Sequence, residues 1–171
     1  MFNFYADSRA YHSWLTYPGS LTARLRAYSQ TFSTLCIRQG MLRPNLDECA
    51  LLGLRHTDRA WVREVILYCD NIPVIFAHSI LPRANTRGIW RFFTRIGNSP
   101  LGDQLFSNPR IRRGSMQFCH LQTPHPLLRQ AHKAIPTLTA TSLWARRSLF
   151  YAQNKPLLVT EVFLPQLLTL S

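Results

Sequence analysis

The sequence has no long hydrophobic run, and no stretch approaches the roughly eighteen apolar residues that a membrane-spanning helix requires. Its first residues, Met-Phe-Asn-Phe-Tyr-Ala-Asp, lack the basic segment and apolar core of a signal peptide. Cysteine is scarce, and the four cysteines at positions 36, 49, 69 and 119 form no Cys-x-x-Cys pair. We therefore expect reduced thiols, a cytoplasmic location and no membrane span.

Several enzyme signatures are missing as well, since no Gly-x-Gly-x-x-Gly, phosphate loop, Gly-x-Ser-x-Gly or His-Glu-x-x-His occurs. Cys119, His120, His125 and His132 are potential metal ligands, but their spacing fits no common site and the region is rich in proline. We therefore expect neither a metal nor a redox cofactor.

Acidic residues are few, with 8 against 20 basic residues, and the formal net charge is +12. Such an excess is typical of proteins that bind nucleic acid, an acidic membrane surface or an anionic substrate. The arginines are scattered, however, and are adjacent only at Arg112-Arg113 and Arg146-Arg147. They form no stripe with exposed aromatic residues, so we expect a generally basic surface without a specific nucleic-acid partner.

With 171 residues, 46% of them hydrophobic, the chain is long enough for one core, and we expect a single domain over residues 1–171. Hydrophobic alternation predicts strands at 32–39, 61–69, 74–81, 113–121, 147–151 and 157–164. Capping residues predict helices at 8–15, from Ser20, from Thr86, from Ser99-Pro100 and around 127–133. Residues 40–59 are interpreted as mostly irregular. The pattern indicates an α+β fold with a mainly antiparallel sheet of about six strands.

The strand between Lys155 and Pro165 is apolar on both faces and is therefore predicted to be central and buried. It carries one carboxylate, Glu161, and a buried carboxylate is normally paired or protonated. A lone arginine, Arg63, has a similar position in the strand 61–69, on one face with Trp61, Val65 and Leu67. We interpret the two residues either as a buried ion pair or as parts of a small polar ligand site.

Two predicted helix starts add potential anion-binding groups. Leu21 follows Ser20, and Leu101 follows Ser99-Pro100. Amides in the first turn of a helix have no partner inside the helix and can bind a carboxylate. If they converge with Arg63, one charge and two dipoles would hold a carboxylated ring, which Glu161 would face. Two ordinary capped helices remain the alternative.

Several short segments carry a resemblance to a known family: Ser13-Trp14-Leu15, Gly19-Ser20-Leu21-Thr22, 61–65, Ile80-Leu81-Pro82, 96–102 with Leu105-Phe106, 145–148 and 156–165. In this order, and over nearly the whole chain, they are similar to the bacterial chorismate pyruvate-lyases, which make 4-hydroxybenzoate for ubiquinone biosynthesis. The resemblance implies a single α+β domain whose six-stranded antiparallel sheet has helices on one side and encloses its ligand beneath helical flaps.

The resemblance also implies a carbon–oxygen lyase that converts chorismate to 4-hydroxybenzoate and pyruvate without a cofactor, and that acts as a monomer. It assigns catalysis to Arg63 and Glu161, and substrate binding to Leu21, Arg63, Leu101 and Glu161. His78 stands where we expect arginine in some relatives, and we interpret it as a packed or locally bonded side chain. Two alternatives are a non-catalytic sensing domain for aromatic carboxylates, with the fold of bacterial regulator effector domains, and a basic nucleic-acid-binding protein.

Overall fold

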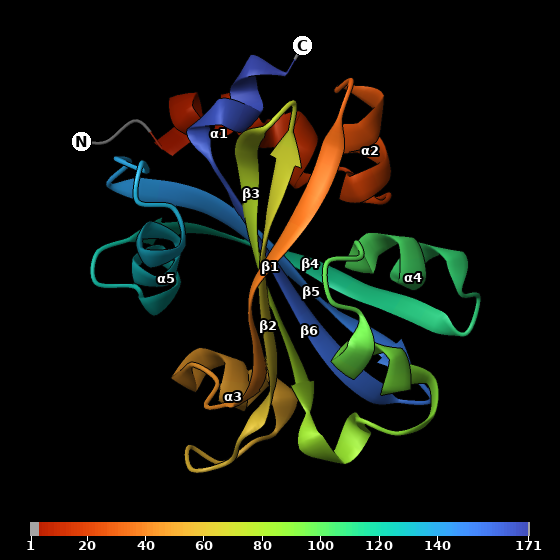
Figure 1. The fold of residues 1–171 in the computed structure, drawn as a ribbon. Helices are drawn as coiled ribbons and strands as arrows, with labels where there is room; N and C mark the ends of the chain where they lie inside the picture. Colours follow the sequence, from red (N-terminus) through yellow and green to blue (C-terminus); the bar gives the residue numbers. More distant parts are fainter. Residues whose placement is uncertain (1–3, 171) are drawn as a thin grey trace.

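The computed structural model describes residues 4–170, with side chains from Ser8 onward. One six-stranded sheet forms its centre, in the order β1-β2-β3-β6-β5-β4, and every neighbouring pair is antiparallel (Figure 1). The strands are β1 (Phe32–Leu42), β2 (Ala60–Cys69), β3 (Ile72–Pro82), β4 (Ile111–Gln122), β5 (Ser142–Ala152) and β6 (Lys155–Phe163). The predicted α+β fold with an antiparallel sheet is confirmed.

Two hairpins supply the four inner strands, β2 with β3 and β5 with β6. Each turn places two residues at positive φ, Asp70-Asn71 in the first and Gln153-Asn154 in the second. Two-residue turns of this kind match the twist of the strands that they join, and asparagine and aspartate tolerate the left-handed conformation. The hairpins pair along β3 and β6, so β6 is an inner strand, as its two apolar faces predicted.

Helices cover both faces of the sheet (Figure 1). One face carries α1 (Phe4–Leu15), α2 (Leu21–Ala27), α4 (Leu101–Ser107) and the 3-10 helices η2 (Gly88–Arg95) and η3 (Pro165–Thr169). The opposite face carries α3 (Leu46–Leu52) and α5 (Pro126–Ala134). The expectation of helices on one side is therefore wrong for α3 and α5. Because the inner strands are apolar on both faces, an uncovered face would expose the core to water.

The irregular interpretation of residues 40–59 is wrong as well, because it missed α3. The backbone N–H of Asn45 donates to Oε2 of Glu48 at 2.7 Å, and Gly53 ends the helix at a φ of 64°. This is a capped helix of seven residues with a left-handed C-terminus. Pro44 and Gly53 flank this helix and do not interrupt it.

Two other helix starts differ from the prediction. The helix expected from Thr86 is the 3-10 helix η2, which begins at Gly88 and follows a separate short turn, η1 (Arg83–Asn85). Helix α4 begins at Leu101 with Pro100 at its N-cap, so the Ser99 side chain does not cap it. This shift leaves the backbone carbonyl of Ser99 available to another group.

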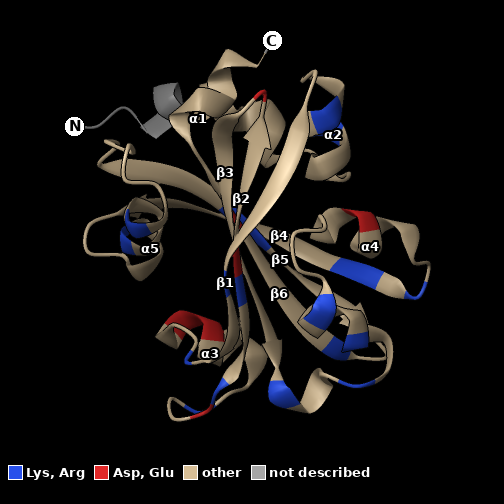
Figure 2. Cartoon of the chain, in the orientation of Figure 1, with Lys and Arg blue, Asp and Glu red and all other residues tan. Residues whose placement is uncertain are grey.

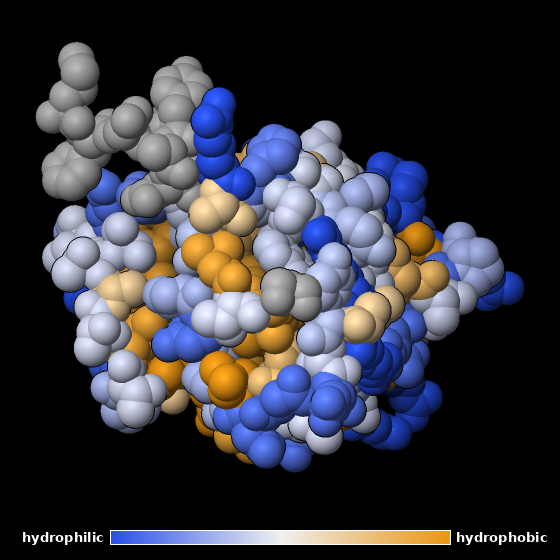
Figure 3. Space-filling view, turned by 90° about the horizontal axis from the view of Figure 1, so that it is seen from above, coloured by the Kyte–Doolittle hydropathy of each residue, from blue (hydrophilic) through white to orange (hydrophobic). Residues whose placement is uncertain are grey.

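Charged and apolar side chains are dispersed over the surface. Lys and Arg appear in separate places on several elements, and α3 and α4 carry acidic residues (Figure 2). Exposed apolar residues include Ile72 and Leu168, and in the view from above hydrophobic residues are interrupted by polar ones (Figure 3). Among the helices of residues 4–170, none is long and apolar enough to cross a membrane.

Candidate active site

The four predicted site residues, Leu21, Arg63, Leu101 and Glu161, line one pocket on the sheet face that α2 and α4 cover. Its walls are otherwise largely apolar. The volume of the cavity is about 40 Å³, which is room for a few water molecules. An aromatic ligand must therefore displace some of the side chains that cover the pocket.

Arg63 is the buried cation of this pocket, with only 1% of its surface exposed. Its Nη2 donates to the carbonyl oxygens of Gly97 and Ser99, both at 2.8 Å, while its Nε has no partner among the described residues. Burial lowers the pKa of the guanidinium, and the Cys36 thiol opposes this effect. No described carboxylate pairs with Arg63, so guanidinium donors remain for a ligand.

Glu161 is paired with Arg146 of the adjacent strand β5, and not with Arg63 as the ion-pair interpretation proposed. Arg146 Nε donates to Glu161 Oε2 at 2.6 Å. Its Nη1 donates to three backbone carbonyls near the C-terminus of α1, those of Trp14, Leu15 and Tyr17. The arginine thus ties α1 to the sheet and fixes Glu161, whose other carboxylate oxygen has no described partner.

Helices α2 and α4 begin beside each other at this pocket. The Ser20 side chain caps α2 by accepting a hydrogen bond from the Ala23 N–H at 3.2 Å. The two helices approach closely because α4 has glycine at its second position: a Cβ on Gly102 would lie 2.8 Å from Oγ1 of Thr22. The first turns of both helices, whose amides lack intrahelical partners, therefore line the same space.

A further arginine, Arg113 of β4, lines the pocket and was missed by sequence reasoning. Its Nε donates to Ser148 Oγ at 3.0 Å and its Nη1 donates to the Pro18 carbonyl at 3.1 Å. The centroids of the Phe106 and Phe150 rings lie 5.8 and 5.4 Å from its guanidinium carbon. Burial, followed by the neighbouring Arg146 cation, lowers the pKa of Arg113.

The sequence model of the chorismate lyase family matches residues 3–170. The chain belongs to the chorismate lyase family. A relative from Aromatoleum aromaticum named "Probable chorismate pyruvate-lyase" is 48% identical over 158 residues, which cover 92% of this chain and 85% of the relative. A protein of the same name from Nitrosomonas europaea is 46% identical over 154 residues, covering 90% and 86% of the two chains. The family resemblance of the sequence is thereby confirmed.

Solved structures share the fold of this chorismate lyase family member at low sequence identity. The effector domain of PhnF from Mycobacterium smegmatis has a TM-score of 0.62 at 13% identity, covering 86% of this chain and 90% of that one. The C-terminal domain of the histidine utilization repressor from Pseudomonas syringae has a TM-score of 0.56 at 8% identity, covering 80% and 93%. At these identities the likeness concerns the fold alone.

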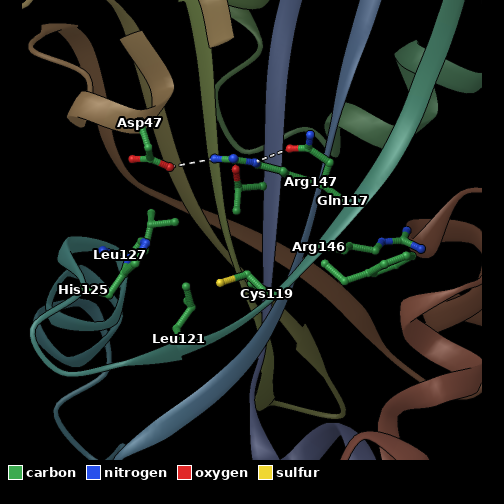
Figure 4. A pocket seen from close by; sticks show the side chains of 11 residues that line it. Asp47, Gln117, Cys119, Leu121, His125, Leu127, Arg146 and Arg147 are labelled. Carbon is green, nitrogen blue, oxygen red and sulfur yellow. Dashed lines mark hydrogen bonds and ion pairs between the residues drawn. The ribbon is translucent and has the colours of Figure 1, made fainter. Parts of the chain in front are cut away.

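A larger cavity of about 340 Å³ lies on the opposite face of the sheet, between α3 and α5 (Figure 4). Arg147 spans it, donating to Asp47 Oδ2 at 2.7 Å and to Gln117 Oε1 at 2.9 Å. The Arg146 side chain points away from this cavity. Because Arg147 already has a carboxylate partner, this cavity lacks the uncompensated buried cation of the smaller pocket. The smaller pocket is therefore the better candidate site in this chorismate lyase family member.

His78 is a locally bonded side chain, as predicted. Its Nδ1 lies 3.0 Å from Oε1 of Glu64, and its Nε2 lies 3.2 Å from Oε1 of Glu48. Burial by itself would lower the pKa of His78, but the hydrogen bonds to the two carboxylates outweigh burial and raise the pKa to about 9. Since Glu64 and Arg63 are consecutive strand residues, this buried triad lies on the face away from the pocket.

The four potential metal ligands do not converge. Cys119 and His120 are consecutive residues of β4 and point to opposite faces of the sheet. His125 accepts a hydrogen bond in the first turn of α5, and His132 contacts a backbone carbonyl. Across the described side chains, no group of three or more His, Cys, Asp or Glu residues is placed to hold a metal ion.

Proposed function

We propose that this protein is a chorismate pyruvate-lyase, which converts chorismate to 4-hydroxybenzoate and pyruvate. The observation that carries the proposal is the buried Arg63, which has no described carboxylate partner and shares its pocket with Glu161. A carboxylated ring would supply the missing negative charge through charge-assisted hydrogen bonds. The Leu21 and Leu101 amides would complete the anchor for that carboxylate. The names of the matched relatives support the same activity.

The proposed reaction is a redox-neutral elimination. The ether bond between the ring and the enolpyruvyl oxygen breaks, and the neighbouring ring carbon loses its hydrogen as a proton. The released enolpyruvate takes up a proton at its methylene carbon and becomes pyruvate, so the atoms of chorismate are all found in the two products. Because the ring becomes aromatic, the protein mainly has to hold a reactive conformer and stabilise developing charge.

Glu161 takes the position next to the ring hydroxyl in this proposal. Arg146 holds one carboxylate oxygen at 2.6 Å, and the other oxygen is free of described partners and can accept a hydrogen bond from the hydroxyl. Arg146 acts through Glu161 and is a positioning residue. Arg63 and Glu161 would thus fix the carboxylate and hydroxyl ends of the ring, and both would contact the reacting molecule.

Ligand entry requires the pocket to open, because a cavity of about 40 Å³ does not hold an aromatic ring. Helices α2 and α4 are seven residues each and cover the pocket, so we propose that they are the flaps that move. A cytoplasmic location, a monomeric state, the absence of a specific nucleic-acid partner and the use of 4-hydroxybenzoate for ubiquinone remain parts of the proposal that rest on the sequence.

Incubation of the purified protein with chorismate tests the function directly. We expect equal amounts of 4-hydroxybenzoate and pyruvate, formed well above the rate of spontaneous chorismate breakdown and unaffected by EDTA. Chorismate binding without conversion would favour the non-catalytic sensing domain, for which the shared fold of regulator domains is the only support. A loss of turnover in EDTA that a divalent ion restores would contradict the cofactor-free reaction.

A further inference from the structure

The candidate pocket has an excess of positive charge. Three arginines, Arg63, Arg113 and Arg146, stand against one carboxylate, Glu161, in and directly behind its lining. Arg146 and Glu161 compensate each other at 2.6 Å. Neither Arg63 nor Arg113 pairs with a described carboxylate, and both are at least partly buried. A ligand with two anionic groups would balance these two cations, whereas a monoanion would leave one of them unbalanced.

The sheet order separates the two uncompensated arginines. Arg63 is on β2, Glu161 on β6 and Arg113 on β4, with β3 and β5 lying between them in turn. Neighbouring strands are about 4.8 Å apart, so the backbones of Arg63 and Arg113 lie roughly 19 Å apart on opposite sides of Glu161. Both long side chains extend to the same pocket. The pocket therefore has a cation at each end and a carboxylate between them.

The polar groups of chorismate are arranged in an order that complements Arg63, Glu161 and Arg113. One carboxylate is on the ring, the hydroxyl is on the opposite ring carbon, and the second carboxylate is on the enolpyruvyl ether beside the hydroxyl. With the ring carboxylate at Arg63 and the hydroxyl at Glu161, one orientation of the ring turns the ether group toward β4, where Arg113 lies. We infer that Arg113 binds the carboxylate of the enolpyruvyl group. This inference rests on the proposed function and assigns the second charged end of the substrate.

The contacts of Arg113 prepare it for this role. Ser148 Oγ and the Pro18 carbonyl hold its Nε and Nη1, while its Nη2 has no described partner. A guanidinium held in this way loses little further freedom when it binds an anion. It would also stay next to the oxygen that gains negative charge as the ether bond breaks, which stabilises the transition state. 4-Hydroxybenzoate has no second carboxylate, so Arg113 would distinguish substrate from product.

Replacement of Arg113 by glutamine tests the inference, with Arg112→Gln as the matched control. Arg112 is the preceding residue of β4, is exposed, and contacts the Tyr151 ring outside the pocket. Arg113→Gln should raise the KM for chorismate roughly 10- to 100-fold, the range for a lost charge-assisted hydrogen bond. The Kd for 4-hydroxybenzoate should stay within about threefold of the wild-type value. Arg112→Gln should change neither quantity.

A non-reacting pair of ligands separates binding from turnover. 3-(Carboxymethoxy)-4-hydroxybenzoate carries a second carboxylate beside the hydroxyl, and 4-hydroxybenzoate lacks it. Calorimetry of the wild type should show tighter binding of the dicarboxylate, and Arg113→Gln should remove this preference. If thermal melting shows that the glutamine variant is unfolded, Arg113→Lys replaces it in this experiment. The lysine variant should retain part of the preference for the dicarboxylate, since lysine keeps the positive charge but lacks the planar guanidinium.

The outcomes distinguish this inference from the proposed function. If the wild type converts chorismate and the preference for the dicarboxylate is the same with and without Arg113, the assignment of Arg113 is wrong and the function stands. If the wild type neither converts chorismate nor binds 4-hydroxybenzoate, the proposed function itself is wrong.

Discussion

At the scale of single residues, the buried charges of this protein fall into two kinds. Arg146 has one carboxylate partner and His78 has two, so the charges of both residues are compensated within the fold. Arg63 has only carbonyl partners among the described residues, and the pocket beside it is where a counter-charge can bind. A buried cation of this second kind lowers stability unless a ligand compensates it, which is typical of a functional site.

Replacing Arg63 by alanine should weaken substrate binding by about 2–4 kcal/mol, because it removes the partner of a buried carboxylate. Arg63→Lys should recover only part of this loss, since lysine lacks the planar guanidinium. The value of kcat/KM for chorismate measures the effect. Arg147→Ala is the matched control, because Arg147 lies on the opposite face of the sheet and pairs with Asp47. Near wild-type kcat/KM in Arg63→Ala would show that Arg63 does not bind the substrate.

Glu161→Gln should weaken the binding of 4-hydroxybenzoate more than that of benzoate, because only 4-hydroxybenzoate offers a hydroxyl to this position. The amide oxygen of glutamine can still accept the Arg146 hydrogen bond, so the local structure should be retained. Calorimetry with the two ligands gives the ratio of their Kd values. An equal loss for both would mean that Glu161 does not contact the hydroxyl.

The sequence identified Arg63 and Glu161 because each is a single charge on an apolar strand face. The same criterion applies to Arg146, which lies on one strand face with Trp144 and Phe150. Arg146 could therefore have been identified from the sequence. The sequence could not show that Arg146 pairs with Glu161, because this pairing depends on the order of the strands in the sheet. Strand β3 lies between β2 and β6, which places Arg146, and not Arg63, directly beside Glu161.

At the scale of elements, the triad of Glu48, Glu64 and His78 joins three segments that are distant in sequence. Glu48 comes from α3, Glu64 from β2 and His78 from β3. Helix α3 has only seven residues, and short isolated helices are marginal in water. The buried contacts with His78, together with the apolar contact of Leu52, therefore hold α3 against the sheet.

The raised pKa of His78 makes this contact sensitive to pH. The pKa is about 9 in the folded protein and ordinarily 6.5, so the protonated imidazole stabilises the folded state. This stabilisation is complete below about pH 6.5 and is lost as the pH rises through 9, with a total on the order of 3 kcal/mol. Urea denaturation between pH 6 and pH 9 should show the decline.

His78→Gln is the control for this decline in the free energy of unfolding, because glutamine is uncharged from pH 6 to pH 9. The variant should be less stable than the wild type at pH 6, and the difference should shrink toward pH 9. Subtracting one curve from the other removes the contribution of thiols such as Cys49, whose pKa is raised by burial. A constant difference across the range would mean that His78 does not titrate as stated.

At the scale of the whole molecule, the sequence pattern predicted about six strands and their antiparallel pairing, whereas the expectation of helices on one side came from the family resemblance. Two apolar faces were visible for the strand from Lys155 to Pro165, and they require cover on both sides. Which helix covers which face was not visible, because the sequence of a helix does not specify the sheet face on which it packs, and α3 lies between residues typical of loops. Register and layer assignment depend on contacts between distant segments, which the local sequence pattern does not contain.

Product release from this enclosed pocket is expected to be slow. 4-Hydroxybenzoate keeps the ring carboxylate and hydroxyl of chorismate, so it retains the proposed contacts with Arg63 and Glu161. Contacts that the product satisfies as well as the transition state do not speed the reaction, and release through α2 and α4 can limit turnover. We expect clear product inhibition by 4-hydroxybenzoate and much weaker inhibition by benzoate or pyruvate. The melting temperature should rise most with 4-hydroxybenzoate and much less with benzoate or pyruvate, because a ligand that binds only the folded state stabilises it. A folded protein that shows no melting shift with 4-hydroxybenzoate at millimolar concentration would contradict the whole pocket assignment.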